Sequence, residues 1–284
     1  MQTLESVIKQ CRGVVFRHHR DQRGVRQHLN ALAKSHLGPM PVEHLTAADI
    51  HGLVDDMIND QAADGTVVHR IAKLNRVLSY AYDRGLRTQP PPKVNITRHT
   101  RQREYEISVE VEAQMAQALA KRGAKFVHLF NFLLYTAARY GEATKLTWSH
   151  VTDSHVTFLA STVKTGKTRT LPLFPPAAEA IRFGRQHYAN DAGPFAWAQD
   201  HHVFYRAWRP AKKAIGLQDE KDFVPHACRH TCITRLAREG MSTMSLQQWG
   251  GWASLAMLER YSHLEASRDL SHATARYAID RAPG

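Results

Sequence analysis

The chain has 284 residues, of which 43% are hydrophobic and 23% are charged, an ordinary globular composition for one large or two modest domains. Its 38 Lys and Arg residues exceed its 26 Asp and Glu residues by 12, which favours a polyanionic partner such as a nucleic acid. With three cysteines, no apolar run near the roughly 20 residues of a membrane span and no signal peptide, the composition excludes a disulfide miniprotein and predicts a soluble cytoplasmic protein.

The first part of the chain, residues 1–92, is predicted to be a helical block. Apolar residues recur three and four positions apart near 23–36, 46–59 and 66–84. Thr46 is the expected N-cap of the second segment. A proline-rich stretch then ends the helices, and residues 93–106 form a predicted linker whose early part carries four basic residues and no acid. Such a linker suits a path along a phosphate backbone, although a solvated linker has a similar composition.

The second block, residues 107–284, is predicted to be mainly α-helical with a small antiparallel β-sheet. Ser108 is the expected N-cap of its first helix, and an apolar helical stripe from Phe126 to Ala137 leads directly to Arg139. Two β-rich runs, 155–160 and 168–173, flank a predicted hairpin turn, and helices resume near 176–187, near 202–215 and after Pro225.

Physical arguments speak against two familiar site motifs. The Gly-Lys-Thr triplet at 166–168 lacks the glycine that a phosphate loop needs at position 161 and leads into a strand, so no nucleotide is expected. The alternating His and Cys residues at 226–232 invite a zinc assignment, but on a helix successive members point about 200° apart. The sequence therefore predicts neither a cofactor nor a metal.

A set of cationic, imidazole and phenol side chains remains. Arg139 follows a buried helix, and His226 and Arg229 lie one helical turn apart on the same face, so both can approach one small anion. Taken singly, each has a structural explanation: Arg139 and Glu142 as a surface ion pair, His226 as a helix cap, or an aromatic side chain in the core. Their joint order and spacing favour the functional interpretation.

That order resembles the tyrosine recombinases, the phage integrases and their Xer-like relatives. Residues 135–148 (YTAARYGEATKLTW) resemble the first arginine box, with Glu142 at the acidic position and Ala137 where many members have glycine. Residues 163–173 are similar to the hairpin that carries the catalytic lysine, here assigned to Lys164 rather than Lys167. Residues 225–231 resemble the His-x-x-Arg box, Gly250-Gly251-Trp252 takes the place of a common Leu-Gly-His, and the nucleophile follows nine residues later.

The resemblance implies a helical core DNA-binding domain at 1–92, an interdomain linker at 93–106 and a catalytic integrase domain at 107–284. It implies site-specific recombination through a 3′-phosphotyrosyl intermediate, with no metal or nucleotide. The implied catalytic residues are Arg139, Lys164, His226, Arg229, Trp252 and Tyr261, supported by Glu142. An indole has only a donor, so Trp252 is expected to pack the pocket and donate to phosphate without exchanging a proton.

The expected partner is double-stranded DNA at attachment sites, bound by a homotetramer with possible accessory DNA-bending factors. The expected setting is the cytoplasm of a prokaryotic host, in association with the nucleoid, where the enzyme integrates or excises a mobile element such as a viral genome. A separate arm-binding domain does not fit before residue 1, so we expect it either to be absent or to have been removed. Two alternatives stay open: a type IB topoisomerase, which rejoins the original strand, and a non-catalytic DNA-binding protein with the same fold.

Overall fold

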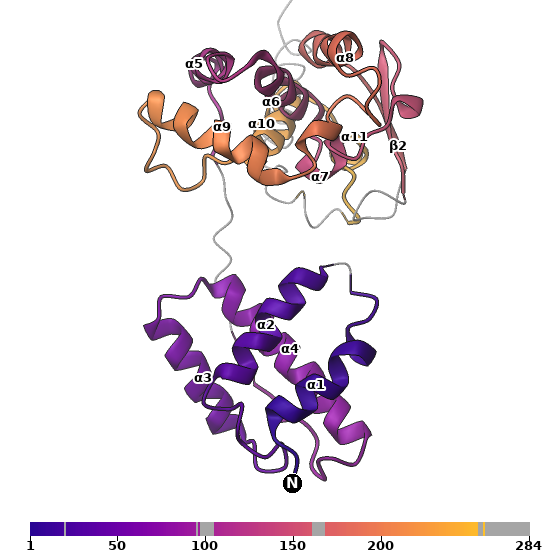
Figure 1. Ribbon diagram of the computed structural model, residues 1–284. Helices are drawn as coiled ribbons and strands as arrows, with labels where there is room; N and C mark the ends of the chain where they lie inside the picture. Colours follow the sequence, from indigo (N-terminus) through magenta and orange to yellow (C-terminus); the bar gives the residue numbers. More distant parts are fainter. Residues whose placement is uncertain (20, 95, 97–104, 161–167, 255–257, 259–284) are drawn as a thin grey trace, which may run out of the picture. The chain divides into compact units, whose positions relative to one another are not determined.

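The structure is a computed structural model that describes residues 1–284 except 20, 95, 97–104, 161–167, 255–257 and 259–284 (Figure 1). It divides into two compact units, Met1–Gln102 and Arg103–Gly284. Across the described residues the chain is mostly helical, with one two-stranded antiparallel sheet, which confirms the predicted fold class.

The first unit is a four-helix unit around an apolar core. Its elements are α1 (Leu4–Val15), α2 (Gln22–Lys34), α3 (Ala47–Asn59) and α4 (Asp64–Asp83). The long α4 contacts each of the other three helices, and its apolar stripe, which includes Leu74 and Leu78, is completely buried. Burial of such a stripe, rather than intrinsic propensity, supplies most of the stability of helices of this length.

The ends of these helices follow local sequence signals. At the start of α3 the Thr46 hydroxyl accepts a hydrogen bond from the Asp49 backbone N–H (3.3 Å), and the Asp49 carboxylate accepts one from the Thr46 backbone N–H (2.8 Å). This reciprocal pair satisfies two N–H groups that the first helical turn leaves without partners. Shortly after α4, Gly85 adopts φ +67°, a conformation that glycine tolerates best.

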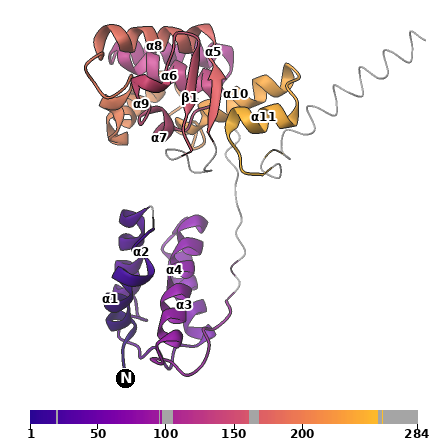
Figure 2. The same ribbon diagram turned by 90° about the vertical axis from the view of Figure 1, so that its right-hand side faces the viewer.

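The second unit contains more, shorter elements. They are α5 (Val109–Ala120), α6 (Ala124–Thr136), α7 (Tyr140–Ala143), the 3₁₀ helix η1 (Trp148–His150), β1 (His155–Phe158), β2 (Arg169–Pro172), α8 (Pro175–His187), the 3₁₀ helix η2 (Ala196–Ala198), α9 (His201–Ala214), α10 (His226–Arg238) and α11 (Thr243–Gly250). Helix α6 packs against α5, α8 and α10, and Figure 2 shows α6 beside α8 within this unit. No helix of the described residues is long and apolar enough to cross a membrane.

The sheet fixes which side chains of the second strand face inward. Strands β1 and β2 pair antiparallel, with His155 opposite Pro172 and Phe158 opposite Arg169. Along β2, burial alternates so that Arg169 and Leu171 are buried while the residues between and after them are exposed. The two predicted strands are therefore confirmed in slightly shorter form, and the predicted turn with Lys164 lies outside the described residues.

Candidate active site

The turn that follows α6 positions the first candidate residue. Helix α6 is apolar and buried along the predicted stripe from Leu129 onward, and its C-cap is Ala137, which adopts the left-handed conformation (φ 55°). The chain then turns so that Arg139 becomes the N-cap of the short helix α7. The Arg139 side chain is 25% exposed, whereas the Glu142 side chain, one turn later, is 3% exposed. The turn thus presents a guanidinium at the surface above a buried carboxylate.

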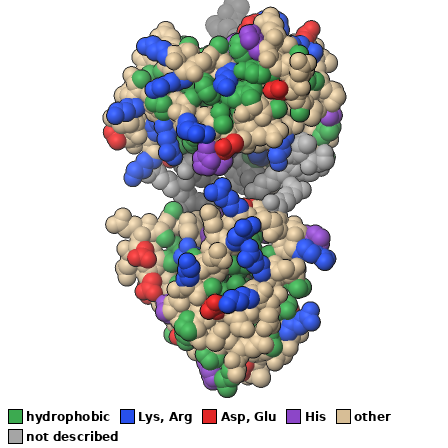
Figure 3. Space-filling model, viewed as in Figure 1, with side chains coloured by type: hydrophobic (Ala, Val, Ile, Leu, Met, Phe, Trp, Pro, Cys, Tyr) green, Lys and Arg blue, Asp and Glu red, His purple; other side chains and the backbone are tan. Residues whose placement is uncertain are grey.

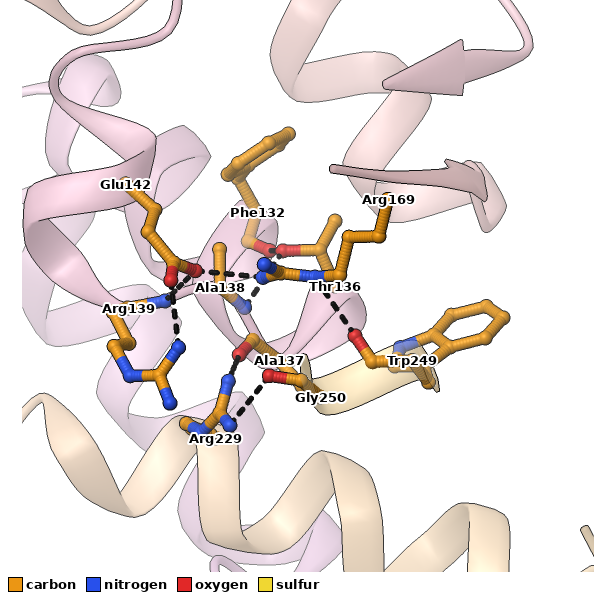
Figure 4. Close-up of polar contacts among 10 residues, drawn as sticks. All are labelled: Phe132, Thr136, Ala137, Ala138, Arg139, Glu142, Arg169, Arg229, Trp249 and Gly250. Carbon is orange, nitrogen blue, oxygen red and sulfur yellow. Dashed lines mark hydrogen bonds and ion pairs between the residues drawn. The ribbon is translucent and has the colours of Figure 1, made fainter. Parts of the chain in front are cut away.

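Both oxygens of that carboxylate bind guanidinium or backbone donors (Figure 4). Oε1 of Glu142 accepts from Nη1 of Arg139 at 2.7 Å. Oε2 accepts from the Arg139 backbone N–H at 3.0 Å and from Nη2 of Arg169 at 2.6 Å. Burial by itself would raise the pKa of Glu142, but the charge and hydrogen bond of Arg169, together with the hydrogen bonds from Arg139, lower it below its ordinary value. Glu142 is therefore an ionised carboxylate that links two arginines.

The second candidate arginine lies against the same turn. Arg229, on α10, is 3% exposed; its Nη1 donates to the Ala137 carbonyl and its Nη2 to the Gly250 carbonyl, both at 2.6 Å. Arg139 follows Ala137 by two residues, so the two arginines meet at one turn although 90 positions separate them in the chain. In Figure 4 their guanidinium groups lie on the same side of that turn.

Trp252 completes this arrangement on the α11 side. The Arg229 guanidinium carbon lies 4.4 Å from the centroid of the Trp252 ring, in a cation–π contact, and Trp252 is buried. Tryptophan is the aromatic residue that binds a cation best through its face. The predicted role of Trp252 in packing the pocket and donating to phosphate stays a prediction, and the structure shows its ring against the Arg229 guanidinium.

The C-terminal end of α11 is held by two buried arginines. The last carbonyls of a helix have no partner within the helix, and they form the negative end of its dipole. Here the Trp249 carbonyl accepts from Nε of Arg169 at 3.0 Å, and the Gly250 carbonyl accepts from Arg229. Gly251 ends the helix with φ 63°, and a Cβ atom at this position would lie 2.7 Å from Nη1 of Arg169. The glycine therefore allows the arginine to approach the helix end closely.

The structure brings together four of the seven residues expected from sequence. Arg139, Glu142, Arg229 and Trp252 are linked by the contacts above. His226 is the first residue of α10, one turn before Arg229, and it is exposed. Lys164 and Tyr261 lie outside the described residues, so their roles stay predictions.

Sequence reasoning missed Arg169. This side chain is 6% exposed, binds Glu142 and the end of α11, and lies with its guanidinium carbon 4.4 Å from the centroid of the Phe158 ring. The available signal was its alternation with Leu171 in a run that was already predicted to be a β-strand. An arginine at an inward strand position requires a buried acceptor, and Glu142 is that acceptor.

The described part of α10 does not gather its His and Cys side chains as a metal site would. Cys228 and Cys232 are buried, and burial raises the pKa of the Cys232 thiol to about 12. Among the described residues, three potential ligand atoms come close together at Asp200, His201 and His202, at the start of α9, where all three side chains are exposed. This group is remote in sequence from the 226–232 segment that invited the zinc assignment.

Comparison with known proteins identifies the family of this chain. The family model described as "Phage integrase family" matches residues 107–268, more than half of the chain. The chain belongs to the phage integrase family. Tyrosine recombinase XerC of Rhizobium meliloti (strain 1021) is 28% identical to it over 269 residues, which cover 87% of this chain and 82% of the relative. The integrase of Salmonella phage P22 is 40% identical over 67 residues, 24% of this chain and 16% of that protein.

Solved structures agree with the assignment at the level of the fold. A lambda integrase dimer bound to a COC′ core site matches with a TM-score of 0.77 at 17% identity, covering 92% of this chain and 95% of that chain. The Tn1549 transposon integrase in complex with circular intermediate DNA matches with a TM-score of 0.72 at 18% identity, with the same two coverages. The family match and the recombinase relatives make this chain a tyrosine site-specific recombinase.

Proposed function

We propose that this recombinase cleaves and rejoins DNA strands at attachment sites to integrate or excise a mobile element, with Arg139 and Arg229 binding the scissile phosphate. One observation carries the proposal: two arginines 90 residues apart in a phage integrase-family chain lie at the same turn, with Trp252 stacked on one of them. A phosphodiester gains negative charge on its nonbridging oxygens as a nucleophile adds, so donors arranged in advance around those oxygens lower the barrier.

The two arginines differ in exposure, and we infer that they bind the phosphate in different ways. Arg139 is partly exposed and is held from behind by Glu142, so its guanidinium is accessible to a phosphate that approaches from solvent. Arg229 is buried, with its plane fixed by two carbonyls and the Trp252 ring. A guanidinium that is already fixed loses little conformational entropy when it binds an oxyanion.

Family resemblance supplies the remaining roles. The Tyr261 hydroxyl attacks phosphorus and forms a 3′-phosphotyrosyl bond while the bond to the 5′ oxygen breaks. His226 accepts the phenol proton, and the Lys164 ammonium donates a proton to the departing 5′ oxygen. The 5′ hydroxyl of the partner strand then attacks the phosphotyrosine, which regenerates the phenol and a phosphodiester. Because one phosphodiester is made for each one broken, the reaction requires no external energy source.

Charge supports duplex DNA as the partner. Residues 1–103 carry 16 basic and 9 acidic side chains, and residues 104–284 carry 22 and 17, so both units have a cationic excess. Figure 3 shows Lys and Arg side chains spread over the visible face of each unit, with few acidic side chains among them. The DNA complexes of lambda and Tn1549 integrases, and a lambda integrase tetramer bound to a Holliday junction, support a homotetramer on two DNA sites. Accessory DNA-bending factors, a viral mobile element and a nucleoid setting in a prokaryotic cytoplasm belong to the same proposal.

Trapping of the covalent intermediate tests the proposal. The full chain is incubated with sheared DNA from its source organism, covalent complexes are captured, and the attached ends are sequenced to define a cleavage site. A nicked suicide duplex with that site then traps the intermediate, because the short strand next to the cut diffuses away. We expect an adduct with the wild-type protein and none with Tyr261→Phe, which binds the duplex as tightly as the wild type.

The outcomes separate this function from its alternatives. A wild-type protein that binds DNA and never forms an adduct is a non-catalytic DNA-binding protein, which would overturn the proposal. An adduct without strand exchange between two duplexes indicates the topoisomerase-like reaction. Adduct formation followed by exchange between two duplexes supports recombination.

A further inference from the structure

Arg169 is a buried cation that the proposed chemistry leaves without a role. It comes from β2, outside the first arginine box and outside the His-x-x-Arg box. Its Nη2 binds Oε2 of Glu142 at 2.6 Å, its Nε binds the Trp249 carbonyl at 3.0 Å, and its guanidinium lies against the Phe158 ring. One side chain thus connects the carboxylate behind Arg139 with the end of the helix that leads to Trp252.

Stability alone is a poor explanation for this arginine. A buried ion pair costs so much desolvation that apolar side chains of similar volume often stabilise a protein as well or better. In addition, Nη1 of Arg169 is buried without a hydrogen-bond partner among the described residues, which adds an uncompensated desolvation cost. A buried residue with such a desolvation cost is better explained by the way it orients its neighbours.

The geometry of Glu142 depends on Arg169. A carboxylate has two oxygens, and rotation of its plane exchanges their positions. Arg169 holds Oε2 together with the Arg139 backbone N–H, so Oε1 remains directed at the Arg139 guanidinium. Without Arg169, both remaining partners of the carboxylate come from Arg139 itself, so Glu142 loses its one anchor on another element. The partly exposed Arg139 side chain then loses the fixed acceptor that orients it.

We propose that Arg169 is a positioning residue for strand cleavage, which acts through Glu142 on Arg139 and through the Trp249 carbonyl on the end of α11. The inference rests on the proposed function, because it takes Arg139 to bind the scissile phosphate. Because the Arg169 side chain is 6% exposed, we expect it to act through its neighbours and not by contacting DNA. Its removal should therefore slow the chemical step and leave duplex binding unchanged.

The test compares single-turnover adduct formation at saturating suicide duplex with the duplex Kd. Arg169→Met is expected to slow adduct formation about 10- to 100-fold, the usual effect of misplacing a group that binds a reacting centre, with an unchanged Kd. Arg169→Lys keeps the charge but replaces the planar guanidinium with a compact ammonium group. Its rate of adduct formation should therefore lie between that of the wild type and that of Arg169→Met.

A double-mutant cycle tests whether Arg169 works through Glu142. If both residues act on Arg139 as one unit, Glu142→Gln combined with Arg169→Met should be no slower than the slower of the two single variants. The double variant also removes the buried carboxylate charge that Arg169→Met leaves without its Arg169 partner, so its unfolding midpoint in urea should recover while its rate does not. Rate losses that multiply, a wild-type rate in Arg169→Met, or a loss confined to Kd would each overturn the inference.

Arg235→Met is the matched control. Arg235 also belongs to the second unit, and it pairs with Glu112 at 2.7 Å and donates to the Ile107 carbonyl at 2.9 Å. Its loss should lower the unfolding midpoint without slowing adduct formation. An equal slowing in Arg235→Met would mean that the effect of Arg169 is a general loss of structure, and would contradict the inference.

A second readout needs no activity and separates this inference from the proposed function. The Nε–Hε signal of Arg139 in ¹⁵N NMR spectra reports how firmly its side chain is held. We expect a well-ordered signal in the wild type, a mobile one in Arg169→Met, and no change in Arg235→Met. If no adduct ever forms, the proposed function fails while this comparison still decides whether Arg169 positions Arg139; an identical Arg139 signal in wild type and Arg169→Met would overturn the inference.

Discussion

Arg229 is a structural part of the site and, in the proposed function, also binds the phosphate. It is buried, bridges the carbonyls of Ala137 and Gly250, and stacks on Trp252. These contacts come from two separate segments of the chain, the turn after α6 and the end of α11. Its charge therefore stands in a low-dielectric environment, where the attraction between a guanidinium and a phosphate is stronger than in water.

Arg229→Lys should damage both properties. A lysine places one compact charge where a planar fork bridged two carbonyls, so at least one carbonyl loses its donor. We expect a loss of about 1–3 kcal/mol in the free energy of unfolding, measured in urea. Adduct formation should fall by about 10³- to 10⁵-fold, as when a transition-state arginine is removed from other phosphoryl-transfer enzymes. Arg182→Lys, in an exposed pair with Glu179, is the control and should change neither quantity measurably.

Much of the site was accessible from sequence, because its motifs combine several residue types at fixed spacings. The positions of Arg139, Glu142, Arg229 and Trp252 were expected, and the structure brings these four together. Arg169 was not expected, since its meaning depends on which face of β2 is buried and on which carboxylate lies opposite. A local pattern does not contain that pairing, which joins residues 27 positions apart.

At the level of helices and strands, the end of α11 depends on a close approach between backbone and side chain. Gly251 has φ 63°, and a Cβ atom built at this position would lie only 2.7 Å from Nη1 of Arg169. The absence of a side chain therefore leaves space for the guanidinium. Gly216 has a comparable φ of 74°, but no atom lies within 4 Å of its Cβ position. The two glycines share the same backbone constraint and differ in their surroundings.

This pair allows a matched test. Gly216→Ala should lower the free energy of unfolding by about 1–2 kcal/mol, because an alanine is strained in the left-handed backbone conformation. Gly251→Ala should cost about 1–3 kcal/mol more, because the new methyl group displaces a guanidinium that is held on both sides. It should also slow adduct formation, whereas Gly216→Ala should not. Equal unfolding midpoints in urea for the two variants would show that Arg169 does not pack against Gly251 as described.

The elements themselves were predicted where local chemistry is strong. The capping box at Thr46 and the apolar stripes of α3, α4 and α6 fixed those helices closely. Helix α1 has the same spacing at Leu4, Val7 and Ile8, so the signal was present although only a general helical block was predicted. The short helices α7 and α11 carry less periodic signal, because four and eight residues make too few turns for a stripe.

For the molecule as a whole, the charge of +12 predicts strongly salt-dependent DNA binding. With six to ten phosphate contacts, affinity for duplex DNA should fall by about 10³- to 10⁵-fold between 50 and 200 mM salt. On α4, Lys73 and Arg76 both lie over the Phe16 ring, which gathers two cations on one side of that helix. If each of these cations contacts a phosphate, Lys73→Gln and Arg76→Gln should each reduce the slope of log K against log salt concentration by about 1.

Lys9→Gln is the control for this measurement. Lys9 is paired with Glu5 on α1 at 2.7 Å, so its charge is already partly balanced. Its loss should leave the slope nearly unchanged. A slope that responds to Lys9 as strongly as to Lys73 would mean that binding depends on total charge and not on particular phosphate contacts.

The most direct test is to identify the amino acid that carries the DNA. The trapped adduct is digested with nuclease and protease, and the nucleotide-bearing peptide is sequenced by mass spectrometry. We expect a nucleotide joined through its 3′ phosphate to the oxygen of Tyr261, in an amount that falls with Arg139 and Arg229 substitutions. A nucleotide attached to another residue, or attached through a 5′ phosphate, would contradict the assignment of these arginines and this tyrosine to one reaction centre.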